Sequence, residues 1–148
     1  MGKHFLSRRL IDGLRSQRAG TAAVEFALLC PLYLFLLLGM SAYGIYFGAS
    51  HSVQQLSADA ARAAIAGANA TERSTLAAGF IQRNGNGYAF IDPAMLAVTV
   101  GDSTTDPGQF DILLSYDARH LPIWALFDGI AMPGQTIERR STIRIGGI

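Results

Sequence analysis

Residues 26–50, FALLCPLYLFLLLGMSAYGIYFGAS, contain no charged side chain. A helix needs about 20 predominantly apolar residues to cross the hydrocarbon core of a bilayer, and this run exceeds that length. The sequence therefore predicts a transmembrane helix at residues 21–50. Glu25 stands at the head of the run. An ionised carboxylate at the edge of lipid is costly, so its presence needs an explanation.

The basic residues are concentrated before the apolar run. Residues 1–20 have a net charge of +4, which leaves −3 for the rest of a chain whose formal net charge is +1. Basic residues mark the cytoplasmic side of a membrane helix, so we expect a cytoplasmic N-terminus and an extracytoplasmic domain at residues 51–148. Charges of both signs are scattered over that domain, which argues against a nucleic-acid-binding face. The charged residues before the run are Lys3, Arg8, Arg9, Asp12, Arg15 and Arg18.

A secretory signal peptide is the alternative explanation of the N-terminus. It shares the basic start and the apolar stretch, and the small residues GAS before His51 would suit a signal peptidase. The apolar region of a signal peptide is only about 7–15 residues long, which favours the membrane helix. Cys30 is the single cysteine, so the chain can form no internal disulfide.

The membrane helix is expected to continue beyond the bilayer. Residues 51–70, HSVQQLSADAARAAIAGANA, contain no helix breaker and carry a thin stripe of small apolar residues. We therefore expect one helix from about Thr21 to about Ala68, followed by a second at residues 71–84 with Thr71 as its cap. The stripe consists of Val53, Leu56, Ala60, Ala63 and Gly67.

The C-terminal part has the alternating pattern of strands. Apolar residues recur at every second position in residues 96–100 and 110–116, and the turn-forming residues 101–109 separate these two stretches. In residues 137–145, Ile137, Ser141, Ile143 and Ile145 alternate with mostly polar residues, which predicts a third strand. The expected fold is α+β and pilin-like, with the long helix packed on a small antiparallel sheet. The expected organisation is a basic cytoplasmic leader at 1–20, the transmembrane helix at 21–50 and an extracytoplasmic α+β domain at 51–148.

The segment GTAAVEFALLCPLYLFLLLGMSAYGIYF at residues 20–47 follows a basic leader and precedes SADAARAAIAG at residues 57–67. It resembles the TadE-like minor pilins, or pseudopilins, of tight-adherence (Tad, type IVc/Flp) pilus systems. The resemblance implies that an aspartyl prepilin peptidase cuts between Gly20 and Thr21. It makes Glu25 the glutamate of the processing and assembly motif. Major pilins of these systems more often carry tyrosine after that glutamate, so Phe26 favours a minor subunit.

The same resemblance implies the setting and the partners of the protein. It implies a single-pass protein of the bacterial inner membrane, with its C-terminal domain in the periplasm, that takes part in assembly or initiation of an adhesive pilus. The implied partners are the prepilin peptidase, other pilins, the assembly platform of the inner membrane and membrane lipid. Such a protein is a peptidase substrate and not an enzyme, so we expect no cofactor and no small-molecule substrate.

Physical chemistry gives Glu25 a role after cleavage. Removing residues 1–20 exposes an α-amine at Thr21 with a reference pKa of about 8. If the helix enters a filament core, this amine and the Glu25 carboxylate become buried charges that are tolerable only as a pair. We hypothesise that such pairing sets the axial offset between neighbouring subunits. The simpler alternative is that Glu25 interacts favourably with the N-terminal end of the helix dipole.

Other candidate sites are weaker. Gly44 and Gly48 form a small-xxx-small pair that permits close approach of another helix. His51 and His120 lack the spacing of a metal site, and Ser115 and Asp117 near His120 do not by themselves indicate a hydrolytic triad. No catalytic residue and no metal site is expected. Trp124 and Phe127 are expected to pack in or beside the core, with a partner-binding patch as the alternative.

Two other functions are considered beside the minor pilin. One is a membrane-anchored envelope protein whose periplasmic domain binds a partner without entering a filament. The other is a secreted protein released by signal peptidase. The N-terminus of the cell-derived protein separates the three, because it would be Thr21 for the pilin, Met1 for the anchored protein and a residue near His51 for the secreted one.

Overall fold

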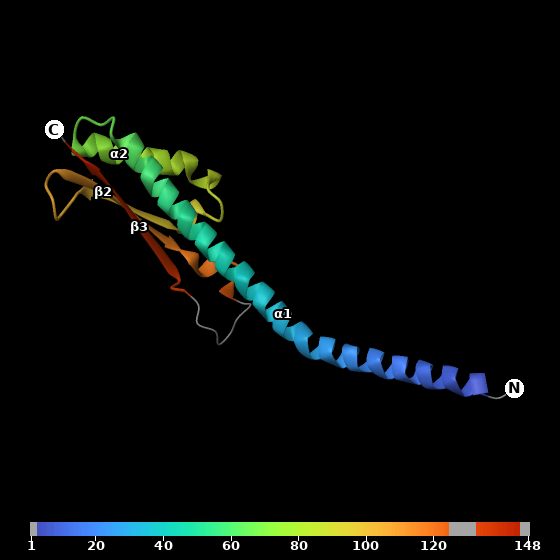
Figure 1. Ribbon diagram of the computed structural model, residues 1–148. Helices are drawn as coiled ribbons and strands as arrows, with labels where there is room; N and C mark the ends of the chain where they lie inside the picture. Colours follow the sequence, from blue (N-terminus) through green and yellow to red (C-terminus); the bar gives the residue numbers. More distant parts are fainter. Residues whose placement is uncertain (1–2, 125–132, 146–148) are drawn as a thin grey trace. The chain divides into compact units, whose positions relative to one another are not determined.

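The computed structural model describes residues 3–124 and 133–145 and has a pilin-like α+β fold (Figure 1). A long helix and a second, shorter helix pack against a three-stranded antiparallel sheet, which confirms the predicted fold class. The elements are α1 (Lys3–Ala64), α2 (Ala70–Asn84), β1 (Leu96–Asp102), β2 (Gln109–Asp117) and β3 (Thr136–Arg144). Short 3₁₀ turns lie at Gly85–Gly87, Pro93–Met95 and Ala118–His120.

The chain divides into two compact units, Met1–Met40 and Ser41–Ile148. Within the first unit, the described residues all belong to α1. The second unit contains the remainder of α1, α2 and the sheet. It begins at Ser41, inside the segment assigned to the membrane from the sequence, because Ala42, Ala49 and Ser50 are buried in its core.

Helix α1 differs from its predicted limits at both ends. It begins at Lys3 rather than near Thr21, since the leader contains no proline and is rich in the strong helix formers leucine and arginine. It ends at Ala64 rather than near Ala68. The turn that follows brings Gly67 so close to α2 that a Cβ there would lie 2.6 Å from the backbone nitrogen of Arg73. The chain therefore leaves the helix before Gly67.

Helix α2 is capped by Asn69, and the prediction that Thr71 caps it is wrong. Asn69 accepts a hydrogen bond from the backbone N–H of Glu72 at 2.9 Å, and the Glu72 carboxylate accepts one from the N–H of Ala68 at 2.9 Å. This reciprocal arrangement satisfies two backbone donors at the helix start. Thr71 lies within the first turn instead.

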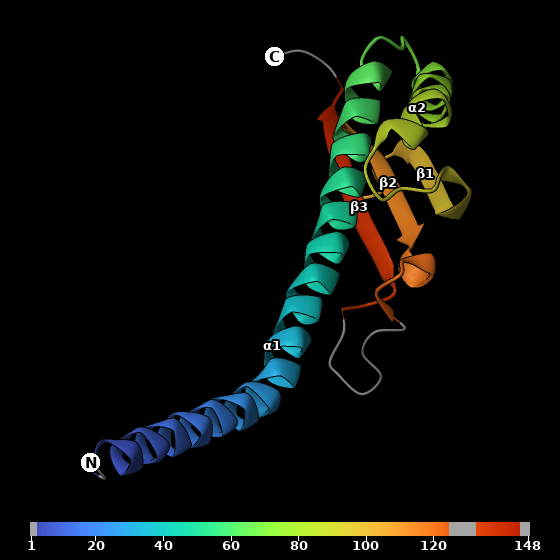
Figure 2. The same cartoon turned by 90° about the vertical axis from the view of Figure 1, so that its right-hand side faces the viewer.

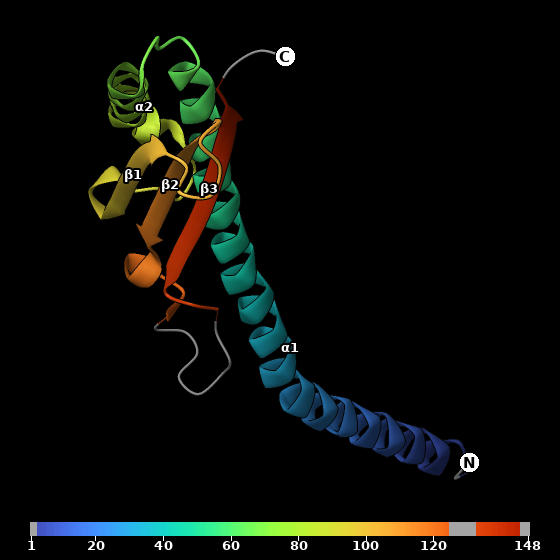
Figure 3. The ribbon, with the colours of Figure 1, turned by 90° about the vertical axis from the view of Figure 1, so that its left-hand side faces the viewer.

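The strands form an antiparallel sheet in the order β1-β2-β3. The central strand β2 alternates completely: Phe110, Ile112, Leu114 and Tyr116 are fully buried, and the residues between them are partly exposed. Helix α2 and the part of α1 in this unit lie on the buried face (Figure 2). Figure 3 shows the sheet from its opposite face, with the strands in front of the helices.

Small residues on α1 let the helix lie close to the sheet. Val53, Leu56 and Ala60 of the predicted stripe are fully buried, and Ala49 and Ala64 extend it. Ala63 is helical but only partly buried, and Gly67 lies beyond the end of the helix. The Ser57 hydroxyl, also fully buried, donates to the carbonyl of Ile112 at 3.3 Å. Burial of a side chain such as Leu56 contributes about 1.5–3 kcal/mol to folding.

Candidate functional site

The predicted processing segment lies within α1. The side chains of residues 20–29 are exposed, including Glu25 and the ring of Phe26, which is 69% exposed. A Cβ at Gly20 would meet no heavy atom within 4 Å. Both Gly20 and Thr21 are helical, so the predicted cleavage between them would require local unwinding of the helix. Glycine has a low helix propensity, which lowers the free-energy cost of unwinding at this position.

The apolar residues that follow are also exposed. Leu28 is 72% exposed and Met40 is 76% exposed. By length and composition, Gly20–Ala64 is a candidate membrane span, and none of its most apolar window is buried within the protein. Such a surface is stable in lipid and unfavourable in water. The helix therefore indicates a membrane-anchored protein.

The two glycines of the small-xxx-small pair have different surroundings. A Cβ added to Gly44 would have no heavy atom within 4 Å. A Cβ added to Gly48 would lie 2.8 Å from Cε2 of Phe90 and 3.0 Å from its Cδ2. The ring of Phe90 therefore packs on Gly48. Phe90 lies in the loop between α2 and β1, and this loop passes beside α1 (Figure 2).

Phe90 is held in an unusual backbone conformation. Its φ angle is +62°, in the left-handed region, and it is the only non-glycine residue with positive φ in the described part of the chain. A residue with a Cβ is disfavoured there by about 1–2 kcal/mol. This role of Phe90 could not be predicted, since an isolated phenylalanine in a loop carries no signal of strain or position.

Tyr116 of β2 holds the Phe90 loop in place. Its hydroxyl donates to the carbonyl of Phe90 at 2.8 Å and accepts from the N–H of Asp92 at 3.2 Å. It also lies 2.8 Å from Nε2 of His120. Because the single phenolic hydrogen goes to Phe90, the imidazole must be the donor in that contact. Burial raises the pKa of the Tyr116 phenol, which keeps it a neutral donor.

Three exposed aromatic residues, which we call the aromatic patch, lie on or against α1: Tyr43, Phe47 and Phe90. Phe47 is 62% exposed and Phe90 is 51% exposed. The ring centroids of Tyr43 and Phe47 lie 6.1 Å apart, and Phe90 rests on Gly48, the next residue along α1. The patch therefore combines two turns of α1 with a loop remote in sequence.

Contacts to β3 and to the segment just before it fix the same part of α1. The Tyr46 hydroxyl donates to the carbonyl of Gly134 at 3.1 Å. The guanidinium of Arg139, on the helix-facing side of β3, hydrogen-bonds to the hydroxyl of Ser50. Residues 46–50 are thus held both by the sheet and by the Phe90 loop.

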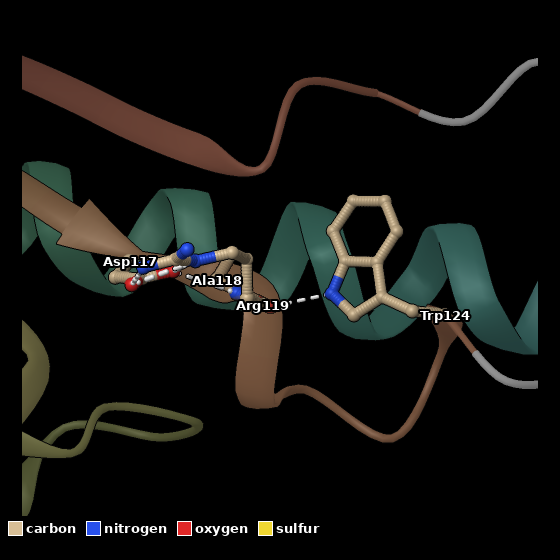
Figure 4. Close-up of polar contacts among 4 residues, drawn as sticks. All are labelled: Asp117, Ala118, Arg119 and Trp124. Carbon is tan, nitrogen blue, oxygen red and sulfur yellow. Dashed lines mark hydrogen bonds and ion pairs between the residues drawn. The ribbon is translucent and has the colours of Figure 1, made fainter.

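The turn after β2 contains a compact polar cluster (Figure 4). The Asp117 carboxylate accepts hydrogen bonds from the backbone and the guanidinium of Arg119, and these bonds lower the pKa of Asp117 to about 2. The Trp124 indole N–H donates to the carbonyl of Ala118, and Trp124 packs against the core as predicted. Phe127 lies outside the described residues.

The arrangement of this turn does not assemble a nucleophile and a base. Ser115 and Asp117 lie on β2 between its buried residues, whereas His120 contacts the hydroxyl of Tyr116. Among residues 3–124 and 133–145, no group of three or more His, Cys, Asp or Glu side chains is placed to hold a metal ion.

Comparison with known proteins matches the N-terminal helix. The family model described as TadE-like protein matches residues 20–62. No curated protein and no solved structure matches the chain. The match begins at Gly20 and covers the exposed apolar helix and most of the helical stripe that packs on the sheet. Residues 20–62 are therefore similar to the TadE-like family.

Proposed function

We propose that this chain is a minor pilin, or pseudopilin, of a Tad pilus system. It is made as a membrane-anchored precursor, cleaved by a prepilin peptidase between Gly20 and Thr21, and takes part in the assembly or initiation of an adhesive pilus. The observation that carries the proposal is the family match that starts at Gly20, ahead of a long helix with an exposed apolar surface and a small α+β domain. In this role the chain is a substrate of the peptidase and not a catalyst.

Cleavage changes which environments the helix tolerates. The leader carries a net charge of +4 and retains the N-terminus on the cytoplasmic side of the membrane. After its removal the exposed apolar surface can move from lipid into a bundle of similar helices, because both environments exclude water. The new α-amine of Thr21 and the carboxylate of Glu25 then neutralise each other between subunits.

The domain organisation of the proposal is a leader at 1–20, a membrane helix at 21–50 and a periplasmic domain at 51–148. The orientation follows from the charge of residues 1–20. Partners in this setting are the peptidase, other pilins, the assembly platform and lipid.

Core packing argues against the secreted alternative. A start near His51 would remove Ala42, Ala49 and Ser50, whose side chains are 1%, 0% and 5% exposed. It would also remove the hydroxyl of Tyr46 that bonds to Gly134. A domain released in this way would lose part of the helix that covers its sheet, and large cavities in a core are destabilising.

The test is the N-terminus of the protein purified from cells, by intact mass and N-terminal sequencing. We expect Thr21 in the native chain and Met1 in Gly20→Leu, because a bulky residue before the scissile bond would not fit a site that takes glycine. Gly39→Leu is the matched control, since a Cβ at Gly39 also meets no heavy atom within 4 Å. It should be cleaved normally. A native chain that retains residues 1–20 would overturn the pilin proposal and leave the anchored envelope protein.

A further inference from the structure

We infer that the aromatic patch formed by Tyr43, Phe47 and Phe90 contacts lipid at the boundary between headgroups and acyl chains. This contact holds the extracytoplasmic domain at the membrane surface. This inference rests on the membrane anchoring in the proposed function. It requires neither cleavage at Gly20 nor entry into a pilus.

The patch is an apolar surface that water does not favour. Phe47 and Phe90 are each more than half exposed. Tyr43 lies beside Phe47, and Phe90 lies on Gly48, the residue that follows Phe47 on α1. Single exposed apolar residues are common on proteins. Exposed aromatic rings from two separate segments that lie along the same two turns of a helix instead mark an interaction site.

The backbone conformation of Phe90 supports a role of this residue in binding. The loop holds this residue in the left-handed region, which asparagine or glycine would adopt more readily. The buried hydroxyl of Tyr116 stabilises the arrangement by its bond to the Phe90 carbonyl. Strained conformations of this kind persist where the surrounding structure enforces them, and they are concentrated at binding sites. The ring of Phe90 is therefore half exposed despite two free-energy costs: the left-handed backbone of this residue and the contact of an apolar ring with water.

The position of the patch along α1 indicates lipid as the occupant. Large exposed apolar side chains run along the helix from Val24 to Phe47, and in the described part of the chain the next one is Ile65, beyond the helix end. The patch thus lies where the apolar surface ends. Aromatic residues are enriched at this level of membrane proteins, where the hydrocarbon meets the headgroups. Phe90 adds a ring from the domain beside those of the helix.

The charges near the patch favour apolar insertion over headgroup pairing. Residues 43–61 and 84–95 contain no lysine and no arginine, and the exposed Asp92 lies two positions from Phe90. Arg139 reaches this part of α1 from β3, but it is a single cation and is hydrogen-bonded to Ser50. A basic cluster would be required for selective attraction to anionic lipid. We therefore expect contact with zwitterionic phosphatidylcholine to be as strong as contact with a bilayer that contains phosphatidylglycerol, and to be insensitive to salt.

The test measures the depth of the Phe90 loop with a nitroxide label, using the full chain in phosphatidylcholine nanodiscs. In a Cys30→Ala background, Ala89→Cys places the label next to an intact Phe90. Ala66→Cys is the matched control, because both alanines are exposed and lie in turns. Collisions with oxygen, which concentrates in lipid, are compared with collisions with a water-soluble nickel complex. Circular dichroism of each variant verifies that it is folded.

We expect the label at residue 89 to favour oxygen and the label at residue 66 to favour the nickel complex. Phe90→Ser should shift residue 89 to the aqueous value, and Phe90→Leu should retain most of the lipid contact. Equal, aqueous values at both sites with Phe90 intact would overturn the inference. Protection of residue 89 that appears only when another pilin is added would also overturn it, in favour of a protein-binding patch. Removing residues 1–20 should leave the depth unchanged, so this test and the cleavage test fail independently.

Discussion

The ring of Phe90 fills the space in which a side chain at residue 48 would lie, since a Cβ on Gly48 would be 2.8 Å from Phe90 Cε2. Gly48 was a candidate for contact with a second helix, and its exposed side is occupied in part by a ring of its own domain. Gly44, one turn earlier, has no heavy atom within 4 Å of the same position. The two glycines should therefore respond differently to the same substitution.

Gly44→Ala should raise the free energy of unfolding by about 1 kcal/mol, because alanine has the higher helix propensity and its methyl group meets nothing. Gly48→Ala should show a smaller gain or none, since the Phe90 ring must move. Thermal unfolding of the full chain in detergent, followed by circular dichroism, compares the two. Equal gains would mean that the ring does not depend on Gly48. Gly44→Leu then tests helix contact: reduced piliation without loss of stability would place Gly44 at a subunit interface.

Backbone strain at Phe90 predicts that glycine is a better replacement than alanine. Both substitutions remove the ring, but alanine keeps the penalty of a Cβ at a φ of +62°. We expect Phe90→Gly to be more stable than Phe90→Ala by about 1 kcal/mol, the lower limit of that penalty. Urea denaturation midpoints measure the difference. If alanine proves the more stable of the two, the left-handed conformation is not maintained in solution.

Loss of the Tyr116 hydroxyl should be strongly destabilising. Tyr116→Phe leaves the carbonyl of Phe90 and the N–H of Asp92 without their partner. Unsatisfied buried groups of this kind raise the free energy of the folded state by about 1–3 kcal/mol. Tyr46→Phe is the control, because its single bond to Gly134 is exposed and water can replace it. Equal, small losses in both variants would show that Tyr116 does not hold the loop.

The strands were predictable because their signal is local. Burial on one face of a sheet imposes a period of two, and β2 carries that period in Phe110, Ile112, Leu114 and Tyr116 without interruption. The α1 stripe was predictable for the same reason at helical spacing, up to the point where the helix ends. Gly67 was misassigned to the helix because its close approach to Arg73 is a tertiary contact that no sequence period records.

The candidate site was predictable only in part. Gly20, Thr21, Glu25 and Phe26 follow from the resemblance of the N-terminal segment to TadE-like proteins, and their roles stay predictions. Phe90 could not be predicted, since its conformation depends on a hydrogen bond from a strand that follows it by more than twenty residues. The cap of α2 was misassigned for a related reason: both Asn69 and Thr71 have capping side chains, and the reciprocal bond from Glu72 decides between them.

Tyr88 should titrate at unusually high pH. Its hydroxyl donates to the Asp59 carboxylate at 2.8 Å. Burial is the largest cause, and this hydrogen bond the second, of the rise in the pKa of Tyr88 from 10.0 to about 12. The folded state favours the neutral phenol, so its contribution to stability is complete below pH 10.0 and disappears as the pH rises through about 12.

Absorbance of the phenolate band, compared between the native chain and Tyr88→Phe, isolates this titration. Asp59→Asn should lower the pKa of Tyr88 without restoring its ordinary value, because burial is the larger cause. A Tyr88 signal that titrates at the ordinary value in the folded native chain would contradict the hydrogen bond to Asp59.

Glu25→Ala should separate processing from assembly. The side chain is exposed on α1 and lies four residues after Thr21, so its loss should leave the fold and the Gly20–Thr21 bond unchanged. In a filament core, however, the freed α-amine would be buried without a counter-charge, which is strongly unfavourable. We expect a chain that begins at Thr21 yet remains in the membrane fraction and is absent from sheared pili, as measured by mass spectrometry and immunoblotting of both fractions.

Glu138→Ala, which removes an exposed carboxylate from β3, is the control and should assemble normally. Normal piliation in Glu25→Ala would refute the pairing of amine and carboxylate, whatever the N-terminus proves to be.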